Sequence, residues 1–148
     1  MHIIFLDIDG VLNSHRTTVA YNSVHRFCPV AVAMLVRLCA ERNCRIVLSS
    51  SWRFLPNWKE KMIACGGEEL IQFIISETPR SAKGFRGDEV KKWIFNWGDL
   101  TNNAPLAKWV ILDDSKDFHD DQPLVLVNRK EGLLLQHIEE CERILGIY

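Results

Sequence analysis

The sequence predicts an α/β fold with a central, mostly parallel five-stranded sheet and helices on both faces. Three short apolar runs, each followed by polar residues, indicate its central strands: 2–6 (HIIFL), 44–48 (CRIVL) and 108–112 (KWVIL). Runs of this length, rich in Ile and Val, are typical of strands that are buried on both faces. Helical patterns lie between them, and strands that alternate with helices favour a parallel sheet with crossover helices.

The remaining elements follow from the same kind of pattern. The runs 71–75 (IQFII) and 124–127 (LVLV) complete the predicted sheet. Helices are expected where apolar residues recur every three or four positions, because that spacing puts them on one helix face. These helices are predicted over residues 30–42, 56–65, 88–97 and 132–145.

Composition sets limits on the class of protein. The length of 148 residues fits one domain, which we expect to span 1–148. The hydrophobic content of 47%, charged content of 25% and net charge of −1 are ordinary for a soluble globular protein. No overall basic excess advertises nucleic-acid binding, although a local basic patch stays open.

The N-terminal run and the cysteines indicate where the protein works in the cell and whether metal or disulfide bonds hold its fold. The N-terminal apolar run at 2–6 is too short for a signal peptide or a membrane span, so we expect a cytoplasmic protein. The cysteines number five and show no CxxC spacing, which argues against a zinc or disulfide framework. Cys39 and Cys141 fall within apolar helical patterns and are expected to be buried thiols.

Polar side chains follow three predicted strands. Asp7 and Asp9 follow the first, Ser49 follows the second, and Asp113 and Asp114 follow the third. In open parallel sheets, reactive groups gather at the carboxyl ends of the strands. We therefore expect these residues, which are distant in the sequence, to meet at one edge of the sheet.

Aspartates at one edge repel each other, and a hard divalent cation would resolve this. Mg²⁺ takes oxygen ligands and usually binds through one or two carboxylates plus a substrate phosphate. The hydroxyl and backbone N–H groups of 49–51 suit phosphate oxygens, and a nearby Lys or Arg would neutralise the remaining charge. The pattern thus indicates a phosphoryl-transfer site.

The same residues resemble the four motifs of the haloacid dehalogenase (HAD) superfamily, in order. The stretches are DIDGVLN, IVLSSSWR, a basic residue before a helix, and VILDDS, and together they run from residue 3 to near residue 127. The resemblance implies a three-layer, Rossmann-like fold. It also implies a phosphatase that uses Mg²⁺ and forms an aspartyl-phosphate intermediate.

Roles for the acids follow from this resemblance. Asp7 would be the nucleophile. Asp9 would be the general acid for the leaving group and then the base for water, with its backbone carbonyl on the metal. Asp114 aligns with the metal-ligating acid and Asp113 with its partner, so all four acids are candidate metal residues. Gly10 would allow the turn that follows.

The second motif supplies candidate substrate contacts. Ser49 would hydrogen-bond the transferring phosphoryl group, and Ser50 or Ser51 would take that role if the strand ended later. Arg53 is a candidate for the substrate-binding surface together with Gly10. Alternatively, Arg53 pairs with one of the clustered acids.

The basic motif has two candidates, Lys83 and Arg86, in SAKGFRGDEVKKW. Arg86 is preferred because it lies closer to the helix start and can grip phosphate oxygens bidentately. Either residue could instead be a solvated loop charge. The family often has a further Asp four residues after the metal ligand. Phe118 stands there, and Asp117, one residue short, is given no role.

No cap domain is expected over the site. A loop and one helix fill the gap between Asp9 and Ser49, and a helix and a strand fill that between Ser51 and Lys83. Neither gap can hold a folded cap. The site should be open, and the resemblance implies that open sites serve macromolecules, which themselves exclude water.

A closer likeness narrows the expected substrate. FLDIDGVLN, SSSWR, GFRGDEVKKWI, WVILDDS and a late EGL are similar to the HAD phosphatase domain of Swiss-army-knife RNA repair proteins. This implies removal of terminal phosphates from RNA or DNA, alone or beside separate repair proteins such as a kinase or ligase. The alternatives are a phosphatase for phosphoproteins or small phosphometabolites, and a non-catalytic phosphate-binding module.

Other polar stretches can be interpreted either as functional sites or as ordinary loops and surface. Residues 119–121 are a polar loop before Pro123 rather than a second metal site, and 101–105 is a connector. Basic and aromatic residues after the first two motifs could bind a nucleic-acid end. A solvated face, with Trp52 packed inside, is the favoured interpretation. These residues are His15, Arg16, Trp52, Arg53, Trp58, Lys59 and Lys61.

Overall fold

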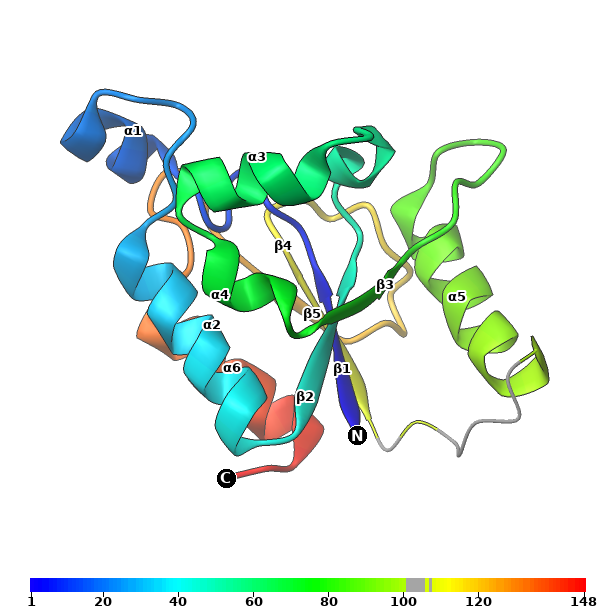
Figure 1. Cartoon of the computed structure of the whole chain (residues 1–148). Helices are drawn as coiled ribbons and strands as arrows, with labels where there is room; N and C mark the ends of the chain where they lie inside the picture. Colours follow the sequence, from blue (N-terminus) through cyan, green and yellow to red (C-terminus); the bar gives the residue numbers. More distant parts are fainter. Residues whose placement is uncertain (101–105, 107) are drawn as a thin grey trace.

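The computed structural model describes the chain except for residues 101–105 and 107, so the predicted connector lies outside the described residues. The sheet has five parallel strands in the order β3-β2-β1-β4-β5 (Figure 1). This confirms the α/β fold class. The strands are β1 (His2–Leu6), β2 (Cys44–Leu48), β3 (Ile74–Glu77), β4 (Trp109–Asp113) and β5 (Leu124–Leu126).

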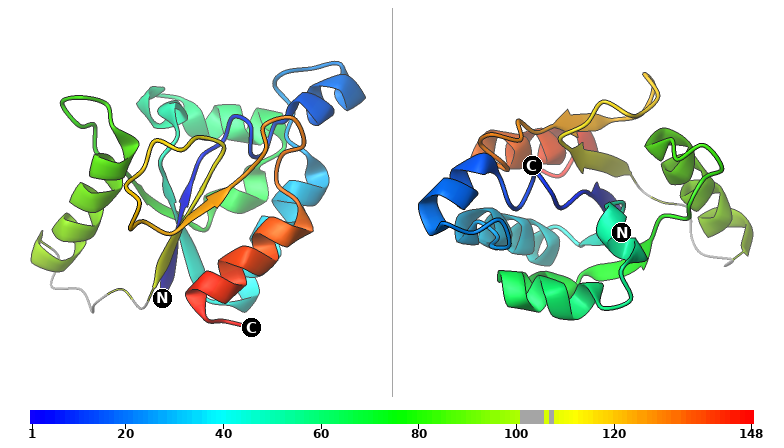
Figure 2. Two further views of the ribbon diagram at one scale, coloured as in Figure 1. Left: turned by 180° about the vertical axis from the view of Figure 1, so that it is seen from behind. Right: turned by 90° about the horizontal axis from the view of Figure 1, so that it is seen from above.

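Helices cover both faces of the sheet, which gives three layers (Figure 2). Along β1, Ile4 and Leu6 pack into one core and Ile3 and Phe5 into the other, so the strand is buried on both sides. The first core is covered by α2, α3, α4 and α6, and the second by α5. These helices are α2 (Pro29–Glu41), α3 (Trp58–Cys65), α4 (Glu68–Ile71), α5 (Arg86–Leu100) and α6 (Leu135–Leu145).

The strand predicted at 71–75 is partly wrong. Its first residue ends α4, and β3 begins only at Ile74. Leu70 is fully buried, and the Phe73 N–H donates to its carbonyl oxygen (3.0 Å), which closes the turn between helix and strand. Periodicity alone does not separate a short apolar run in a strand from the buried end of a helix.

Three short elements were not predicted. They are α1 (His15–Tyr21), a 3₁₀ helix, η1 (Ser51–Phe54), and α4. Ser14 caps α1 by accepting from the Thr17 N–H (3.2 Å). Val19, in the middle of α1, is 83% exposed. This helix therefore has no apolar stripe that its sequence could show.

No cap domain is inserted in the described part of the chain. Only α1 and α2 separate β1 from β2, and only η1, α3 and α4 separate β2 from β3. Both insertion points of a cap are thus filled by short elements of the core fold. The carboxyl ends of the strands lie at the upper edge in Figure 1, and both chain termini lie at the opposite end.

The buried cysteines are as expected. Cys39 and Cys141 are fully buried, and burial raises the pKa of each thiol to about 12. They are therefore protonated core residues rather than nucleophiles. Within the described ranges, no helix is long and apolar enough to cross a membrane.

Candidate active site

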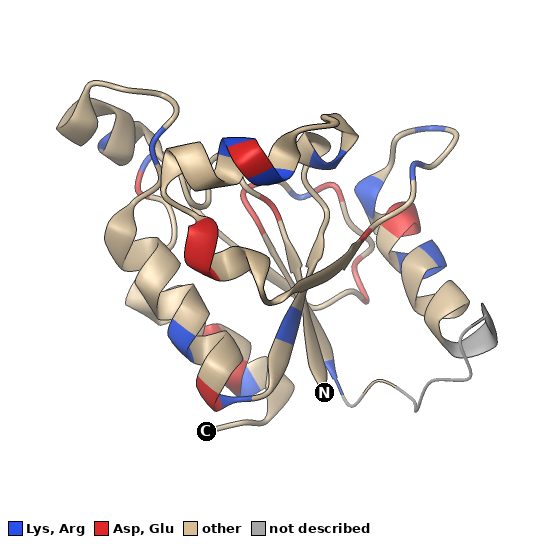
Figure 3. Ribbon diagram, in the orientation of Figure 1, with Lys and Arg blue, Asp and Glu red and all other residues tan. Residues whose placement is uncertain are grey.

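Three neighbouring strands deliver the predicted site residues to one place. Leu6 pairs with Leu48 of β2 and with Leu112 of β4, so the next residue of each strand lies at the same level. The Asp7 N–H donates to the Leu112 carbonyl (3.0 Å), and the Ser49 N–H donates to the Leu6 carbonyl (3.0 Å). Figure 3 shows acidic residues gathered at the upper ends of the central strands. Sheet register alone therefore puts Asp7 beside Ser49.

A guanidinium neutralises part of this acidic edge. Arg86, the first residue of α5, places Nη1 2.6 Å from Asp113 Oδ2 and 3.4 Å from Asp7 Oδ1. The alternative basic candidate, Lys83, is exposed in the preceding loop. Asp117, which the sequence left without a role, holds the helix start, because its carboxylate accepts from the Arg86 N–H (3.3 Å). The structure thus brings Arg86, and not Lys83, to the two acids.

Burial and mutual repulsion set the charge state of the acids. Burial, followed by repulsion from Asp113 and Asp114, raises the pKa of Asp7 to about 8, against the opposing pull of Arg86. Burial also raises the pKa of Asp113 to about 6, again against Arg86. Burial alone would lower the pKa of Arg86, but the carboxylates of Asp7 and Asp113 more than offset this and raise it. Arg86 therefore does not by itself offset the burial and mutual repulsion of these acids.

The donor set suits a hard cation. Asp7, Asp113 and Asp114 each offer one carboxylate oxygen, and these three atoms lie within 4.8 Å of one another. Asp113 is also committed elsewhere, because it accepts from Arg86 and from the Ser115 N–H (2.8 Å). Oxygen-only donors at this density are those that Mg²⁺ prefers. The residues present therefore fit a magnesium ion.

Asp9 sits in a different environment from Asp7. It is exposed, and both of its carboxylate oxygens are held: Oδ1 accepts from Asn13 Nδ2 (2.8 Å) and Oδ2 from Trp52 Nε1 (3.1 Å). Gly10, which directly follows Asp9, has φ of 83° and lies in the turn after the two acids. A Cβ at Gly10 would collide with the Asp114 carboxylate. Glycine is therefore required there both for its backbone conformation and for space.

The serines of the second motif have three different environments. The Ser49 hydroxyl is buried and has no hydrogen-bond partner in the described part of the chain. Ser50 caps η1, since its Oγ accepts from the Trp52 N–H (3.2 Å). Ser51 is exposed. A buried polar group without a partner is costly, so the Ser49 hydroxyl is the one left over for a ligand.

Arg53 lies beneath the site rather than on its surface. Its side chain is 3% exposed and pairs with Glu89 at 2.7 Å. It also donates to the carbonyl oxygens of Ser49 (2.7 Å), Ser50 (2.8 Å) and Thr78 (2.9 Å). The guanidinium thereby ties the end of β2 to the residues after β3. The structure gives Arg53 a positioning role, and its predicted acidic partner is Glu89 rather than one of the clustered aspartates.

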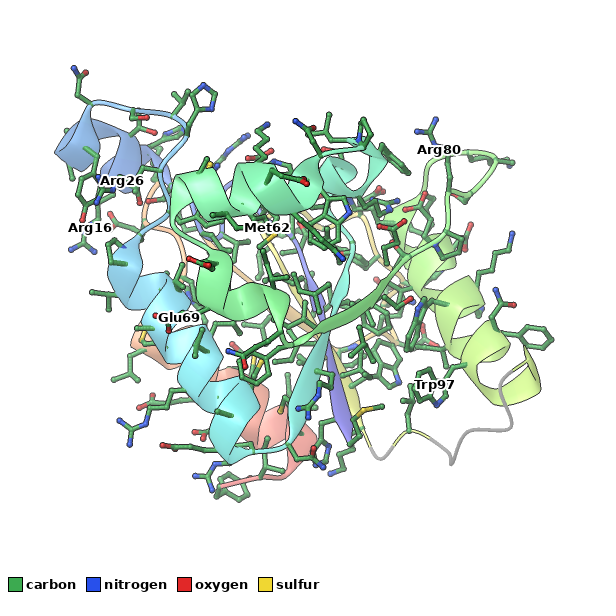
Figure 4. The ribbon with its side chains drawn as sticks, in the orientation of Figure 1. Arg16, Arg26, Met62, Glu69, Arg80 and Trp97 are labelled. Atoms are coloured by element: carbon green, nitrogen blue, oxygen red, sulfur yellow. The ribbon has the colours of Figure 1, made fainter. Side chains whose placement is uncertain are left out.

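Two of the basic and aromatic residues after the first two motifs, Trp52 and Arg53, are buried and therefore belong to no exposed surface. Trp52 is buried against Phe27, with ring centroids 5.5 Å apart, which agrees with the packing interpretation. Lys61 lies over the Trp52 ring at 4.3 Å. Arg16 projects from α1, at the far side of the molecule from Arg80 (Figure 4).

The loop at 119–121 holds no second metal cluster that the described residues reveal. The imidazole Nε2 of His119 lies 2.7 Å from Asp88 Oδ1 of α5, and the backbone N–H of His119 donates to Gln122 Oε1 (2.9 Å). This agrees with the prediction of a polar loop before Pro123.

Four residues of the site were missed by sequence reasoning. Asn13 stood inside the quoted DIDGVLN stretch, so its motif position was a usable signal. Asp117 was noticed but given no role. Arg129, whose Nε lies 3.7 Å from Asp114 Oδ2, and Glu89, the partner of Arg53, had no signal in the sequence.

These features define the class of the site. At the carboxyl edge of a parallel sheet the structure brings together a buried carboxylate beside a guanidinium, a hydroxyl with no partner among the described residues, and a second, exposed acid, a set of groups that suits phosphoryl transfer. The chain belongs to the family of HAD domains in Swiss Army Knife RNA repair proteins, whose family model matches residues 3–138. No curated protein and no solved structure matched the chain in the corresponding searches.

Proposed function

We propose that this chain is a magnesium-dependent phosphomonoesterase that removes terminal phosphates from nucleic acid through an aspartyl phosphate on Asp7. The observation that carries the proposal is the contrast between the two acids of the first motif. Asp7 is 3% exposed and lies beside Arg86, whereas Asp9 is exposed and held by two neutral donors. This contrast supports Asp7 as the nucleophile and Asp9 as the acid that exchanges protons with solvent.

In the first step, an Asp7 carboxylate oxygen forms a bond to phosphorus while the bond from phosphorus to the leaving oxygen breaks. Asp9, in its protonated form, gives its proton to that leaving oxygen. In this proposal Arg86, which lies beside Asp7, and the Ser49 hydroxyl, which has no partner among the described residues, donate hydrogen bonds to the phosphoryl oxygens during the transfer. A bound Mg²⁺, held by Asp7, Asp114 and the Asp9 carbonyl, would screen the carboxylate from the phosphate charge.

In the second step, Asp9 takes a proton from water as the water oxygen bonds to phosphorus. The bond between phosphorus and the Asp7 oxygen then breaks, which releases inorganic phosphate and restores both acids. The hydrogen bonds from Trp52 and Asn13 fix the Asp9 carboxylate in one orientation for both proton transfers. A positioned acid and base of this kind contributes about a hundredfold or more to the rate.

The nucleic-acid substrate is supported by the family and by the open edge. The family model is that of a domain in RNA repair proteins. No cap domain is inserted in the described part of the chain, which favours a large substrate that reaches Asp7 and itself excludes water.

The test is a parallel release assay with magnesium. The substrates are 3′-phosphorylated and 5′-phosphorylated oligonucleotides of RNA and DNA, phosphopeptides, nucleotides and nitrophenyl phosphate. We expect phosphate release from the oligonucleotides, none from the Asp7→Asn variant, and none after chelation of the metal. Asp120→Asn, which changes an exposed acid outside the cluster, is the matched control and should keep full activity.

Three other outcomes would contradict the mechanism, the substrate class or the enzymatic activity. Undiminished turnover by Asp7→Asn would refute the aspartyl-phosphate mechanism. Faster release from phosphopeptides or nucleotides would favour the alternative phosphatase. If no substrate is turned over, including nitrophenyl phosphate, the chain is a phosphate-binding module instead.

A further inference from the structure

A cavity adjoins the site on the side of Arg86. Its volume is about 460 Å³, which is in the range of small-molecule sites. It opens between η1, the loop after β3 and the start of α5. The residues on which the argument rests are Ser51, Phe54, Arg80, Ser81, Arg86 and Glu89. Arg86 lines the cavity and also pairs with Asp7 and Asp113, so the cavity lies next to the acids.

Three arginines line this cavity, and two of them are already neutralised. Arg86 pairs with Asp113 and Asp7, and Arg53 pairs with Glu89. Arg80 is exposed and forms no ion pair with any carboxylate in the described ranges. Its guanidinium is therefore the uncompensated positive charge of the cavity.

The position of Arg80 is fixed by its neighbours. Its Cζ lies 3.9 Å from the centroid of the Phe54 ring, a cation–π contact. The next residue, Ser81, is anchored to α5, because its N–H donates to Glu89 Oε1 (3.0 Å). In Figure 4, Arg80 stands on the loop between β3 and α5, at the same edge as the carboxyl ends of the strands. The charge is thus presented beside the site.

We propose that this cavity is the subsite for the nucleotide next to the scissile phosphate, with Arg80 paired to the flanking phosphodiester. The inference rests on the proposed function and deepens it. A terminal phosphate at Asp7 is followed in a polynucleotide by a second anion one nucleotide away, whereas a mononucleotide has none. A guanidinium held on an aromatic ring also offers a flat surface to a sugar or base, and the Ser51 hydroxyl adds a hydrogen-bond group.

The experiment compares three substrates that differ only beside the scissile phosphate. They are a dinucleotide with a terminal phosphate, its analogue with a neutral methylphosphonate linkage, and the mononucleotide, each as 3′ and 5′ phosphates. We expect kcat/KM of the wild-type chain to favour the charged dinucleotide over the neutral analogue by about tenfold. In Arg80→Ala this preference should fall to near unity, mainly through KM, and Arg80→Lys should restore part of it.

Two controls separate binding from folding and from chemistry. Nitrophenyl phosphate, which has no flanking anion, should be turned over equally by Arg80→Ala and wild type. Arg37→Ala removes another exposed guanidinium, from α2 and outside the cavity, and should leave the dinucleotide preference intact. A loss of nitrophenyl phosphate turnover in Arg80→Ala would overturn the subsite, because Arg80 would then support the site as a whole.

The remaining outcomes distinguish this inference from the proposed function. If oligonucleotides are turned over but the charge preference is missing, or survives in Arg80→Ala, the subsite is wrong and the function stands. If nitrophenyl phosphate is hydrolysed and no nucleotide is, both fail. Faster, Arg80-dependent turnover of a phosphopeptide with a neighbouring acidic residue would assign the cavity to phosphoproteins and overturn the inference.

Discussion

The indole of Trp52 donates a hydrogen bond to the carboxylate of Asp9, with Nε1 3.1 Å from Oδ2. The ring itself is 5% exposed and packs against Phe27. One side chain therefore belongs both to the hydrophobic core and to the acid that we propose to move protons. Because packing fixes the indole, its hydrogen bond also fixes the orientation of the exposed Asp9 carboxylate.

Replacement of Trp52 by Phe should weaken proton transfer and keep the core filled. A hydrogen bond to a charged group contributes about 1.5 kcal/mol, which corresponds to about a tenfold loss in kcat/KM for alcohol leaving groups. Nitrophenyl phosphate, whose leaving group needs little protonation, should lose much less. Trp109→Phe, a tryptophan on β4 away from Asp9, is the matched control. Equal losses on both substrates would refute this role.

Replacement of Gly10 by Ala should impair magnesium binding. The added Cβ would meet the Asp114 carboxylate, and φ of 83° is unfavourable for alanine. We expect the magnesium concentration for half-maximal activity to rise about tenfold or more. Gly66→Ala is the control, because Gly66 has φ of 97° and an added Cβ there would meet nothing within 4 Å, so it introduces strain alone. An unchanged magnesium titration in Gly10→Ala would contradict the prediction.

Replacement of Ser49 by Ala should separate activity from stability. The hydroxyl is buried and has no hydrogen-bond partner among the described residues, so its removal should leave the free energy of unfolding unchanged or raised. If it binds the phosphoryl group, kcat/KM should fall about a hundredfold. Thr78→Val is the control, since Thr78 Oγ1 is also buried and has no hydrogen-bond partner in the described ranges. That variant should be equally stable and fully active; a matching loss of activity would show that the effect is not specific to Ser49.

Sequence reasoning located the strands and the backbone positions of the site, but not the contacts between distant side chains. Apolar runs identify β1, β2 and β4, and parallel register then brings Asp7, Ser49 and Asp113 together. The Trp52–Asp9 contact joins residues 43 positions apart, and Arg53–Glu89 joins residues 36 apart. Such contacts depend on rotamers and loop paths, which no local pattern encodes.

Because local sequence does not encode long-range contacts, it could not decide between the two candidates for the basic motif. Lys83 and Arg86 are three residues apart, and the sequence offers only their distance from a helix start. The choice is made by Asp117, from a different loop, which accepts from the Arg86 N–H and so begins α5 at that residue. A long-range cap thereby decides which cation reaches the acids.

The metal-free chain should become more stable when Asp7 is replaced by Asn. The folded pKa of about 8 exceeds the unfolded value of 3.8, so the native state binds more protons between these limits. Stability of the wild type should then fall as pH rises through this window, and Asp7→Asn should lack that loss. We expect the gain in Tm of the variant to grow to several degrees from about pH 5 to about pH 8.

Magnesium provides the complementary measurement on Asp7. Binding of the cation to the native state should raise Tm of the wild type above that of its metal-free form at about pH 8, and should raise Tm of Asp7→Asn by less. Asp120→Asn, an exposed acid outside the cluster, should behave like the wild type in both experiments. A destabilised Asp7→Asn variant in the absence of metal would contradict the electrostatic account.

Replacement of Glu89 by Gln tests whether Arg53 positions the site or binds substrate. The pair is buried, with side chains 3% and 5% exposed, so removal of one charge should cost about 3 kcal/mol or more in urea unfolding. KM should not improve, because the guanidinium stays tied to the carbonyl oxygens of Ser49 and Thr78. Glu140→Gln, from a longer and more exposed pair, should cost little. A lower KM in Glu89→Gln would instead show a freed Arg53 binding the substrate.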